Sequence, residues 1–295
     1  MTDRIEALIA QERLPASYID TVDRWWRPLG ERIAQWRMMA GHTLVVGING
    51  AQGSGKSTLC RFLADVLLPE RGLSVATVSL DDFYLRLADR HHMARDTHPL
   101  FRTRGVPGTH DVALGIAVLD DLVAGRDVLL PRFSKALDDR LPQSEWMLQS
   151  GPVDVVLFEG WCVGARPQGA DSLTAPQNRL EAEDDPDGVW RQHVNRALGS
   201  SYAQWFSRID RLVMLKPPSF DAVLRNRLLQ EHKLRLTSQD APGVMDDDAV
   251  RRFVSHYERL TRHMFADLPP HADMLFDLDA AQAIVASHVN AIDAK

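Results

Sequence analysis

Short apolar runs alternate with amphipathic segments along most of the chain. Runs rich in Val, Ile and Leu lie at 43–48, 74–80, 127–130, 153–158, 211–215 and 273–278. The run 153–158 is almost wholly apolar, which is typical of a parallel strand buried on both faces. Segments with helical periodicity, such as 56–68 and 111–122, fall between the runs. This alternation predicts an α/β fold with a doubly wound, mainly parallel sheet flanked by helices.

The first 42 residues show a helical pattern. Val22, Trp26, Leu29 and Ile33 recur at intervals of three and four residues and so form one apolar face. Pro28 can kink this helix or mark a break in it. A stripe of tryptophans can serve as a ligand platform, but it more often packs into a core. We therefore expect residues 1–42 to be a helical N-terminal extension of a main domain formed by residues 43–295.

Residues 165–188 interrupt the order of strands and helices. The segment is rich in Pro, Gly, Asp, Glu, Gln and Asn, which is typical of chain that runs over a protein surface. We expect it to be a mobile surface insertion within the main domain.

The composition argues against a nucleic-acid-binding, secreted or membrane protein. The 295 residues carry a formal net charge of −6, whereas nucleic-acid-binding domains are usually basic. Cys60 and Cys162 lack C-x-x-C spacing, so we expect buried thiols in a reducing compartment. The first 15 residues lack the apolar stretch of a signal peptide, and no segment approaches the roughly 18 apolar residues of a membrane helix. We expect a cytoplasmic protein that binds neither nucleic acid nor membrane, and the sequence leaves its oligomeric state open.

A phosphate-binding loop follows the first predicted strand. Residues Gly50 to Ser57 match the pattern G-x-x-x-x-G-K-[ST] between a predicted strand and a predicted helix. The glycines let backbone N–H groups point at phosphates, and the helix adds its positive N-terminal end. Lys56 should reach the β- and γ-phosphates of ATP, and the Ser57 hydroxyl should ligate Mg²⁺. The residues expected to hold the nucleotide are Gly50, Gln52, Gly53, Ser54, Gly55, Lys56, Ser57 and Thr58.

Carboxylates follow two of the predicted strands. Asp81 and Asp82 come after the strand 74–80, and Glu159 ends the strand 153–158. Ligands of such sheets bind at the carboxyl ends of the strands, so these acids should lie near the phosphates. Asp81 could accept the proton of an attacking hydroxyl, and Glu159 could hold Mg²⁺ through a water. The alternatives are an acidic turn for the two aspartates and a solvent-facing charge for Glu159.

Basic residues gather in the loops between these strands. Arg104 precedes a Pro-Gly-Thr-His-Asp stretch, and Arg132, Lys135 and Arg140 follow the strand 127–130. Arginine and lysine in such loops could clamp the carboxylate or hydroxyls of a small substrate. Singly, an exposed arginine is more often only solvated.

A further basic stretch lies on the helix after the strand 211–215. Kinases of this fold often close a basic helical lid over the transferring phosphate. Arg225 and Arg227 cannot share one helix face, so we expect at most one of them, Arg227, to reach the nucleotide. A surface helix without this role is the alternative.

Together these motifs resemble the D-glycerate 3-kinases of plant and cyanobacterial type, with their bacterial and fungal relatives. That family belongs with the uridine kinase, pantothenate kinase and phosphoribulokinase group. The resemblance runs from about Val45 to Leu278. It rests on Gly50–Ser57, Ser79–Leu85, Arg104–Asp111, Pro131–Lys135, Val155–Trp161, and Arg225–Arg235 followed by Gly243–Asp247.

The resemblance implies an enzyme that phosphorylates the 3-hydroxyl of D-glycerate with Mg-ATP, giving 3-phosphoglycerate. It assigns the base to Asp81, with Lys56 and Arg104 as further catalytic residues, and a magnesium site to Ser57 and Glu159. The acceptor site that it implies consists of Asp82, Tyr84, Arg104, His110, Arg132, Lys135 and Arg140.

Two features depart from the family pattern. The family often has Tyr-Asp where this chain has Phe133-Ser134, and the loop 136–140 looks shortened. Both lie on the acceptor side, so another hydroxyl acceptor, such as a nucleoside, pantothenate or a sugar phosphate, stays open. A nucleotide-dependent switch or chaperone is a third hypothesis, although the chain has no N-K-x-D guanine-reading motif.

Overall fold

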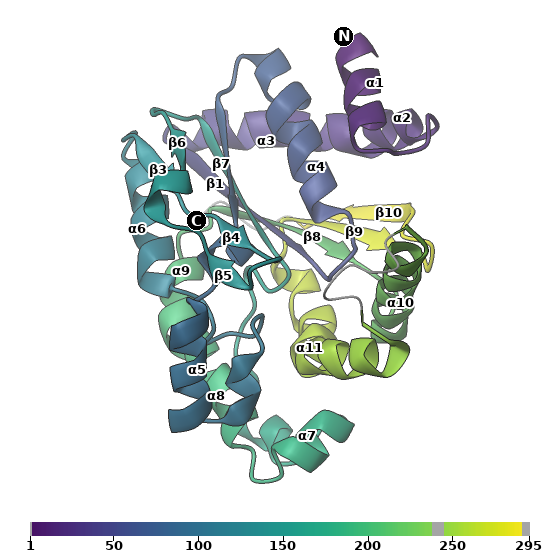
Figure 1. Cartoon of the computed structure of the whole chain (residues 1–295). Helices are drawn as coiled ribbons and strands as arrows, with labels where there is room; N and C mark the ends of the chain where they lie inside the picture. The colour runs from purple at the N-terminus through teal and green to yellow at the C-terminus, as the bar shows by residue number, and fades with distance from the viewer. Residues whose placement is uncertain (1, 238–244, 291–295) are drawn as a thin grey trace.

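A six-stranded sheet forms the centre of the molecule (Figure 1). The computed structural model describes residues 2–237 and 245–290, with the side chains of 3–232 and 245–290. The strands are β1 Leu44–Gly50, β2 Val75–Ser79, β7 Val155–Gly160, β8 Arg211–Lys216, β9 Met274–Leu278 and β10 Ile284–Val289. They stand in the order β10-β9-β8-β1-β7-β2, in which only β10 is antiparallel to its neighbour. The predicted α/β fold with a mainly parallel sheet is confirmed.

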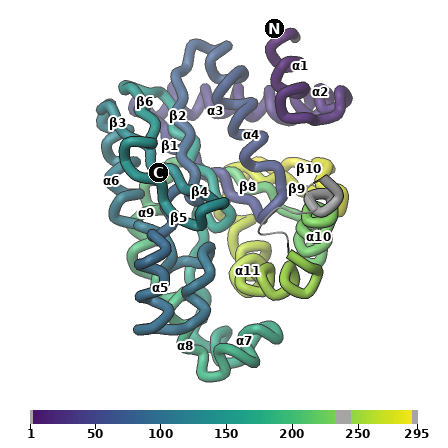
Figure 2. Tube along the Cα trace, viewed as in Figure 1, coloured from purple at the N-terminus to yellow at the C-terminus, as the bar shows by residue number. Residues whose placement is uncertain are grey.

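Helices cover both faces of this sheet (Figures 1 and 2). The helices are α1 Thr2–Gln11, α2 Tyr18–Thr21, α3 Arg27–Ala40, α4 Lys56–Phe62, α5 Leu87–Asp96, α6 Val112–Val123, α7 Arg179–Asp184, α8 Val189–Ala197, α9 Ala203–Phe206, α10 Phe220–Thr237 and α11 Asp247–Asp267. One core joins α1, α3 and α4 to the sheet, and a second core joins α6, α9 and α11 to its other face. In the described part of the chain, no helix is long and apolar enough to cross a membrane.

Alternation along β1 explains how one strand serves both cores. Val46 and Ile48 belong to the core beneath the N-terminal helices, whereas Val45 belongs to the other. Successive side chains of a strand point to opposite faces of the sheet. All seven residues of β1 are buried, as expected of a central strand covered on both sides.

The N-terminal helices pack on the sheet through their tryptophan face. Trp26 is buried, and its ring lies edge-on to Phe276 of β9, with the ring centroids 5.3 Å apart. The helix runs on from α2 into α3 through one wider turn, Val22–Trp26. Pro28 stands in the first turn of α3, where its missing N–H costs little. The tryptophan face therefore forms core, as the sequence predicted.

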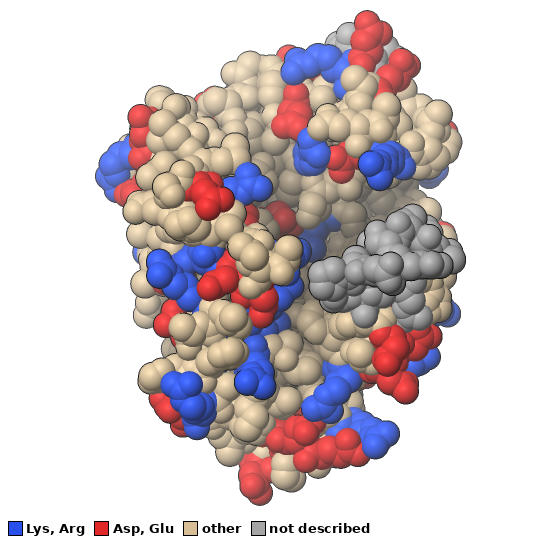
Figure 3. Space-filling view, in the orientation of Figure 1, with Lys and Arg blue, Asp and Glu red and all other residues tan. Residues whose placement is uncertain are grey.

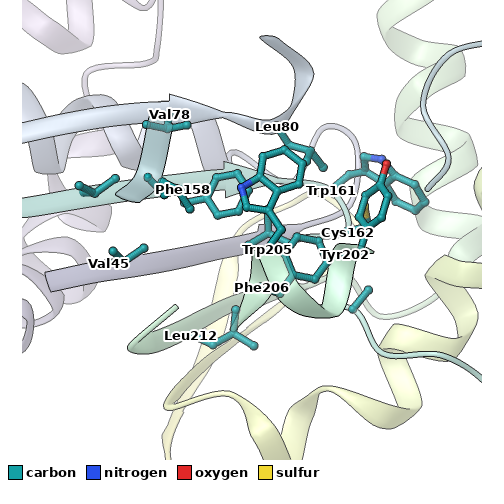
Figure 4. Close-up of a cluster of buried hydrophobic side chains, with 14 of the residues drawn as sticks. Val45, Val78, Leu80, Phe158, Trp161, Cys162, Tyr202, Trp205, Phe206 and Leu212 are labelled. Carbon is teal, nitrogen blue, oxygen red and sulfur yellow. The ribbon is translucent and has the colours of Figure 1, made fainter. Parts of the chain in front are cut away.

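Aromatic side chains, among them Phe158, Trp205 and Phe206, pack together in the second core (Figure 4). Trp205 of α9 lies edge-on to Phe83 at 5.3 Å and tilted against Phe158 of β7 at 5.1 Å. A Cβ at Gly115 of α6 would lie 2.1 Å from the Trp205 ring, so only glycine permits this approach. Phe83 is thereby anchored in the core directly after the two aspartates.

The sheet differs from the sequence prediction at two places. The predicted strand 127–130 is real, but β3 Val128–Leu130 pairs with β6 Met147–Gln149 in a separate antiparallel pair. Its run is short and Leu129 is exposed, so it lacks the two-sided burial of a central strand. The edge strand β10 was not predicted, because its side chains are mostly exposed. A second small pair joins β4 Phe133–Ser134 to β5 Asp139–Arg140.

Buried ion pairs hold the segment 165–188, which contains α7. Glu181 of α7 is fully buried and binds Arg259 of α11 with 2.7–2.8 Å contacts. Asp185 is also buried, and its carboxylate lies 3.0 Å from Arg191 of α8. These contacts tie the segment to two helices of the main domain.

Candidate active site

Two strand ends and the start of α4 bring a carboxylate and two hydroxyls together at the carboxyl edge of the sheet. Glu159 on β7 lies between Ile48 of β1 and Ser79 of β2 in the strand register. Its Oε1 accepts hydrogen bonds from the hydroxyls of Ser57 (3.2 Å) and Ser79 (2.9 Å). Lys56 Nζ lies 4.0 Å from Oε2. Lys56 and Ser57 of the phosphate loop and Glu159 of a separate motif therefore meet at one point.

The loop between β1 and α4 has the backbone shape that phosphate binding requires. Gly53 and Gly55 have φ angles of +77° and +86°, a region that residues with side chains rarely adopt. At Gly50, a Cβ would lie 2.3 Å from Ser54 Oγ. Helix α4 begins at Lys56, so its free N-terminal N–H groups open onto the loop. The remaining predicted loop residues are Gln52, whose side chain reaches the hydroxyl of Tyr257, and Thr58, in the first turn of α4.

The cluster around Glu159 suits Mg²⁺ carried by a nucleotide. Glu159 Oε2 is buried without a hydrogen-bond partner among the described residues, and a carboxylate oxygen beside a hydroxyl is a donor set that Mg²⁺ accepts. No group of three or more His, Cys, Asp or Glu side chains that could hold a metal occurs in the part of the chain that is described. The residues present therefore fit an ion that takes most of its ligands from phosphates and water.

Asp81 is held by two partners at the end of β2. Its Oδ1 accepts a hydrogen bond from the Tyr84 hydroxyl at 2.8 Å, and Lys135 Nζ lies 2.9 Å from Oδ2. Burial raises the pKa of Asp81, but the charges of Lys135 and Lys56 with these hydrogen bonds outweigh it, and the net pKa lies below the ordinary value. Asp81 is therefore ionised at neutral pH, as a proton acceptor must be.

Asp82 has a different role from its neighbour. Its Oδ1 accepts a hydrogen bond from the backbone N–H of Phe133 at 3.0 Å and so ties β4 to the end of β2. Burial raises the pKa of Asp82, partly offset by that N–H. Arg132 beside it is exposed and donates to the sulfur of Met147.

Besides Lys135, two further predicted acceptor cations are already paired with acids. Arg104 contacts the Asp138 carboxylate, and its guanidinium lies 5.3 Å from the centroid of the Phe133 ring. Arg140 donates to Asp111 Oδ2 at 2.9 Å. Basic side chains, interleaved with acidic ones, gather in the middle of the face shown in Figure 3, over β4 and β5.

His110 is buried beneath this group. Its ring stacks on Tyr84 at 4.6 Å, and its Nδ1 lies 2.5 Å from the Tyr202 hydroxyl. Burial lowers the pKa of His110 to about 3, so the ring is neutral. Its Nε2 has no hydrogen-bond partner among the described residues.

Arg227 is paired with an acid on its own helix. Its guanidinium lies 2.7 Å from Glu231 Oε2, one turn further along α10. Arg225 is exposed. The side chains of Lys233 to Arg235, and the residues Gly243 and Val244, lie outside the described residues.

A cleft beside the phosphate loop was not predicted. It has a volume of about 680 Å³ and is lined by the loop 53–58, by residues 14–21 of the N-terminal helices and by the turn between β9 and β10. No motif marks the walls outside the phosphate loop, because they meet it only through the fold.

The parallel sheet, the glycine loop and the Ser57–Glu159 cluster define the class of protein: a P-loop kinase. The chain is 37% identical over 227 residues to an uncharacterized kinase of Schizosaccharomyces pombe, covering 74% of this chain and 79% of that protein. It is 34% identical over 224 residues to the chloroplastic D-glycerate 3-kinase of Arabidopsis thaliana, covering 72% of this chain and 46% of the plant protein, somewhat under half its length. No protein-family model matches the chain.

A solved structure agrees with these relatives. The D-glycerate 3-kinase of Cryptococcus neoformans superposes with a TM-score of 0.71 at 30% identity, covering 84% of this chain and 90% of that one. The chain belongs to the D-glycerate 3-kinase family. It is thus an ATP-dependent phosphotransferase that acts on an alcohol group of a small molecule.

Proposed function

We propose that this protein transfers the γ-phosphate of Mg-ATP to the 3-hydroxyl of D-glycerate. The observation that carries the proposal is Asp81, an ionised carboxylate beside Lys135 and close to the Lys56–Glu159 cluster. A carboxylate that is ionised at neutral pH can accept a hydroxyl proton.

The transfer balances with one bond formed and one broken. The glycerate oxygen forms a bond to the γ-phosphorus, the bond from that phosphorus to the β–γ bridging oxygen breaks, and ADP leaves. Asp81 takes the hydroxyl proton. Lys56 and Arg104 offset the negative charge that spreads over the phosphoryl oxygens.

Ser57 and Glu159 are the residues that would hold magnesium. Ser57 would contribute its hydroxyl, and Glu159 would bind through water. The ion supplies charge neutralisation on the β- and γ-phosphates.

Glycerate carries a carboxylate, and the acceptor side offers donors for it. Lys135 is largely exposed and can turn from Asp81 toward a bound anion. Arg104 and the unpaired Nε2 of His110 are further donors. Tyr84 keeps Asp81 in place, and Asp82 and Arg140 support the loops around them.

The proposal is tested by ADP release from Mg-ATP with D-glycerate, L-glycerate, uridine, pantothenate and ribulose 5-phosphate as acceptors. Strong stimulation by D-glycerate, with 3-phosphoglycerate as product, is the expected result. Stimulation by another acceptor alone would reject glycerate and leave the P-loop kinase class intact.

The base is tested by Asp81→Asn, which we expect to lower kcat by at least 100-fold because it removes the proton acceptor. Asp187→Asn is the matched control, since Asp187 is exposed and far along the chain. Near-normal turnover of a folded Asp81→Asn protein would show that Asp81 is not the base.

A further inference from the structure

The cleft beside the phosphate loop has two chemically different ends. One end is the loop itself, with Lys56 and the N-terminal N–H groups of α4. Apart from Lys56, the described residues that line the cleft are uncharged. A ligand that matches it has an anionic tail and a neutral, flat or apolar body, which is the chemistry of a nucleoside triphosphate. The acceptor-side residues Asp81, Arg104 and Lys135 are absent from this lining.

We propose that residues 14–21 of the N-terminal helices and the β9–β10 turn form the site for the adenosine part of ATP, with Gln282 and Gln230 reading the base. The inference rests on the proposed use of ATP and adds the residues that select the nucleotide. It makes the N-terminal helices part of the catalytic unit.

Tyr18 is the rigid element of the N-terminal wall. Its ring stacks on Phe62 of the helical segment that follows the phosphate loop, with centroids 5.6 Å apart. Its hydroxyl accepts a hydrogen bond from Trp26 Nε1 at 3.2 Å, so the O–H proton is left for another acceptor. Tyr18 therefore presents a fixed apolar body and a free donor to the cleft.

Gln230 of α10 and Gln282 of the turn converge over the loop. A Cβ at Gly53 would lie 3.1 Å from the side-chain nitrogen of each. Neither carboxamide has a hydrogen-bond partner among the described residues. A carboxamide offers one acceptor and two donors, which is the combination that a base edge requires.

The turn is built to present Gln282. Its backbone N–H groups are occupied, because Asp279 accepts hydrogen bonds from the N–H groups of Ala281, Gln282 and Ala283. Gln282 has a φ of 70°, a left-handed conformation that is costly for a residue with a side chain. Such strain is commonly retained where the side chain serves a ligand. Donors for a ligand must therefore come from the side chains of the turn, because its N–H groups are in use.

Titration calorimetry with ATP, GTP and inorganic tripolyphosphate, in magnesium buffer without acceptor, separates the base site from the phosphate site. Gln282→Gly removes the side chain without adding strain, and Gln230→Ala changes an exposed residue. Each should weaken ATP binding by about three- to tenfold and reduce the preference for ATP over GTP. Binding of tripolyphosphate should stay within about twofold of wild type, since it reaches only the loop.

Ser17→Trp tests the N-terminal wall directly. Ser17 lines the cleft, is exposed and caps nothing with its side chain, so a bulky residue there should fill the nucleoside space without unfolding α2. We expect ATP binding to weaken by more than about tenfold, with tripolyphosphate unaffected. Gln204→Ala, an exposed glutamine on α9, is the control and should bind both ligands normally.

Two results would overturn the inference. One is ATP affinity within twofold of wild type in Ser17→Trp, and the other is equal loss of ATP and tripolyphosphate binding in the glutamine variants. These titrations contain no acceptor, so their outcome does not depend on whether D-glycerate is the substrate. A protein that binds ATP as expected here and ignores D-glycerate would refute only the proposed substrate.

Discussion

The hydroxyl of Tyr202 lies 2.5 Å from His110 Nδ1 and fixes which imidazole nitrogen carries the proton. The backbone N–H of Gly108 donates to the same hydroxyl at 3.0 Å. Among the described residues Nδ1 is the acceptor within reach of the tyrosine proton, so we assign Tyr202 as the donor. His110 is neutral, and its single proton therefore resides on Nε2. The buried ring thus offers an N–H donor, without a partner among the described residues, next to Tyr84, which binds Asp81.

Tyr202→Phe should remove the hydrogen bond that orients the His110 ring. The variant leaves His110 Nδ1 and the Gly108 N–H without their partner, which should lower the free energy of unfolding by about 1–3 kcal/mol in urea titrations. The KM for the acceptor should rise while the KM for ATP is unchanged, because His110 would no longer be held as an Nε2 donor. Equal changes in both constants would mean that Tyr202 acts only on stability.

His110 also predicts how stability depends on pH. Burial lowers its pKa to about 3 in the folded protein, against 6.5 ordinarily. Because the folded pKa is the lower one, the unfolded chain binds the proton first as the pH falls. The contribution of His110 is complete above pH 6.5 and is lost toward pH 3, at up to about 1.4 kcal/mol per pH unit.

The measurement is urea unfolding at pH 7.5 and pH 5. His110→Gln should flatten the decrease between the two values, whereas His42→Gln, at an exposed position, should leave it as in wild type. A decrease that is unchanged in His110→Gln would show that other groups cause it.

Lys135 should set the acid limb of the pH–rate profile. Burial raises the pKa of Asp81, and the Lys135 charge is the largest influence that lowers it. Lys135→Ala should therefore move the acid limb of kcat to higher pH, since Asp81 must be ionised to accept a proton. Lys135→Arg keeps the charge and should keep the limb near its wild-type position. An acid limb that does not respond to Lys135→Ala would separate it from Asp81.

The sequence predicted those parts of the site that depend on local patterns. Gly50–Ser57 and Glu159 belong to contiguous motifs whose strands come to neighbouring places in a parallel sheet, so their meeting followed from fold class alone. Asp81 was found by the same reasoning from the end of β2.

Partners that meet only through tertiary contacts could not be predicted. Arg104 pairs with Asp138, 34 residues further along the chain, although the arginine alone looks free to bind phosphate. The pair Arg227–Glu231, by contrast, is a local contact between residues four apart on α10. The cleft walls come from opposite ends of the chain, residues 14–21 and 281–284, and neither carries a motif. The sequence placed residues 127–130 in the main sheet, whereas β3 pairs with β6 outside it. Three apolar residues do not distinguish a central strand from a strand of a small hairpin.

Glu159→Gln should weaken the binding of magnesium more than the binding of the nucleotide. The amide keeps the size of the side chain but loses the charge that binds the Ser57 and Ser79 hydroxyls and that would hold a hydrated ion. We expect the Mg²⁺ concentration for half-maximal rate to rise by about 10- to 100-fold. Glu145→Gln, an exposed change, is the control. An unchanged magnesium requirement would place the ion elsewhere.

The buried ion pair Glu181–Arg259 fastens residues 165–188 to α11. Glu181 is fully buried and binds the Arg259 guanidinium at two points, and Arg259 also donates to the backbone oxygens of Ser172 and Ala175 at 2.7 Å. Glu181→Ala would leave a buried, unpaired arginine, and should lower the free energy of unfolding by about 3–5 kcal/mol. Glu183→Ala, which removes an exposed pair with Arg179 on the same helix, should barely change it.

The loss of this pair should also affect the candidate active site, because α11 carries Tyr257, whose hydroxyl donates to the Arg104 carbonyl at 3.0 Å. Loosening α11 should raise the KM for the acceptor in Glu181→Ala at temperatures where the protein remains folded. Glu181→Gln keeps one acceptor for Arg259 and should lie between the two alanine variants in stability. If Glu181→Ala and Glu183→Ala unfolded at the same urea concentration, the segment would not be fastened by this pair.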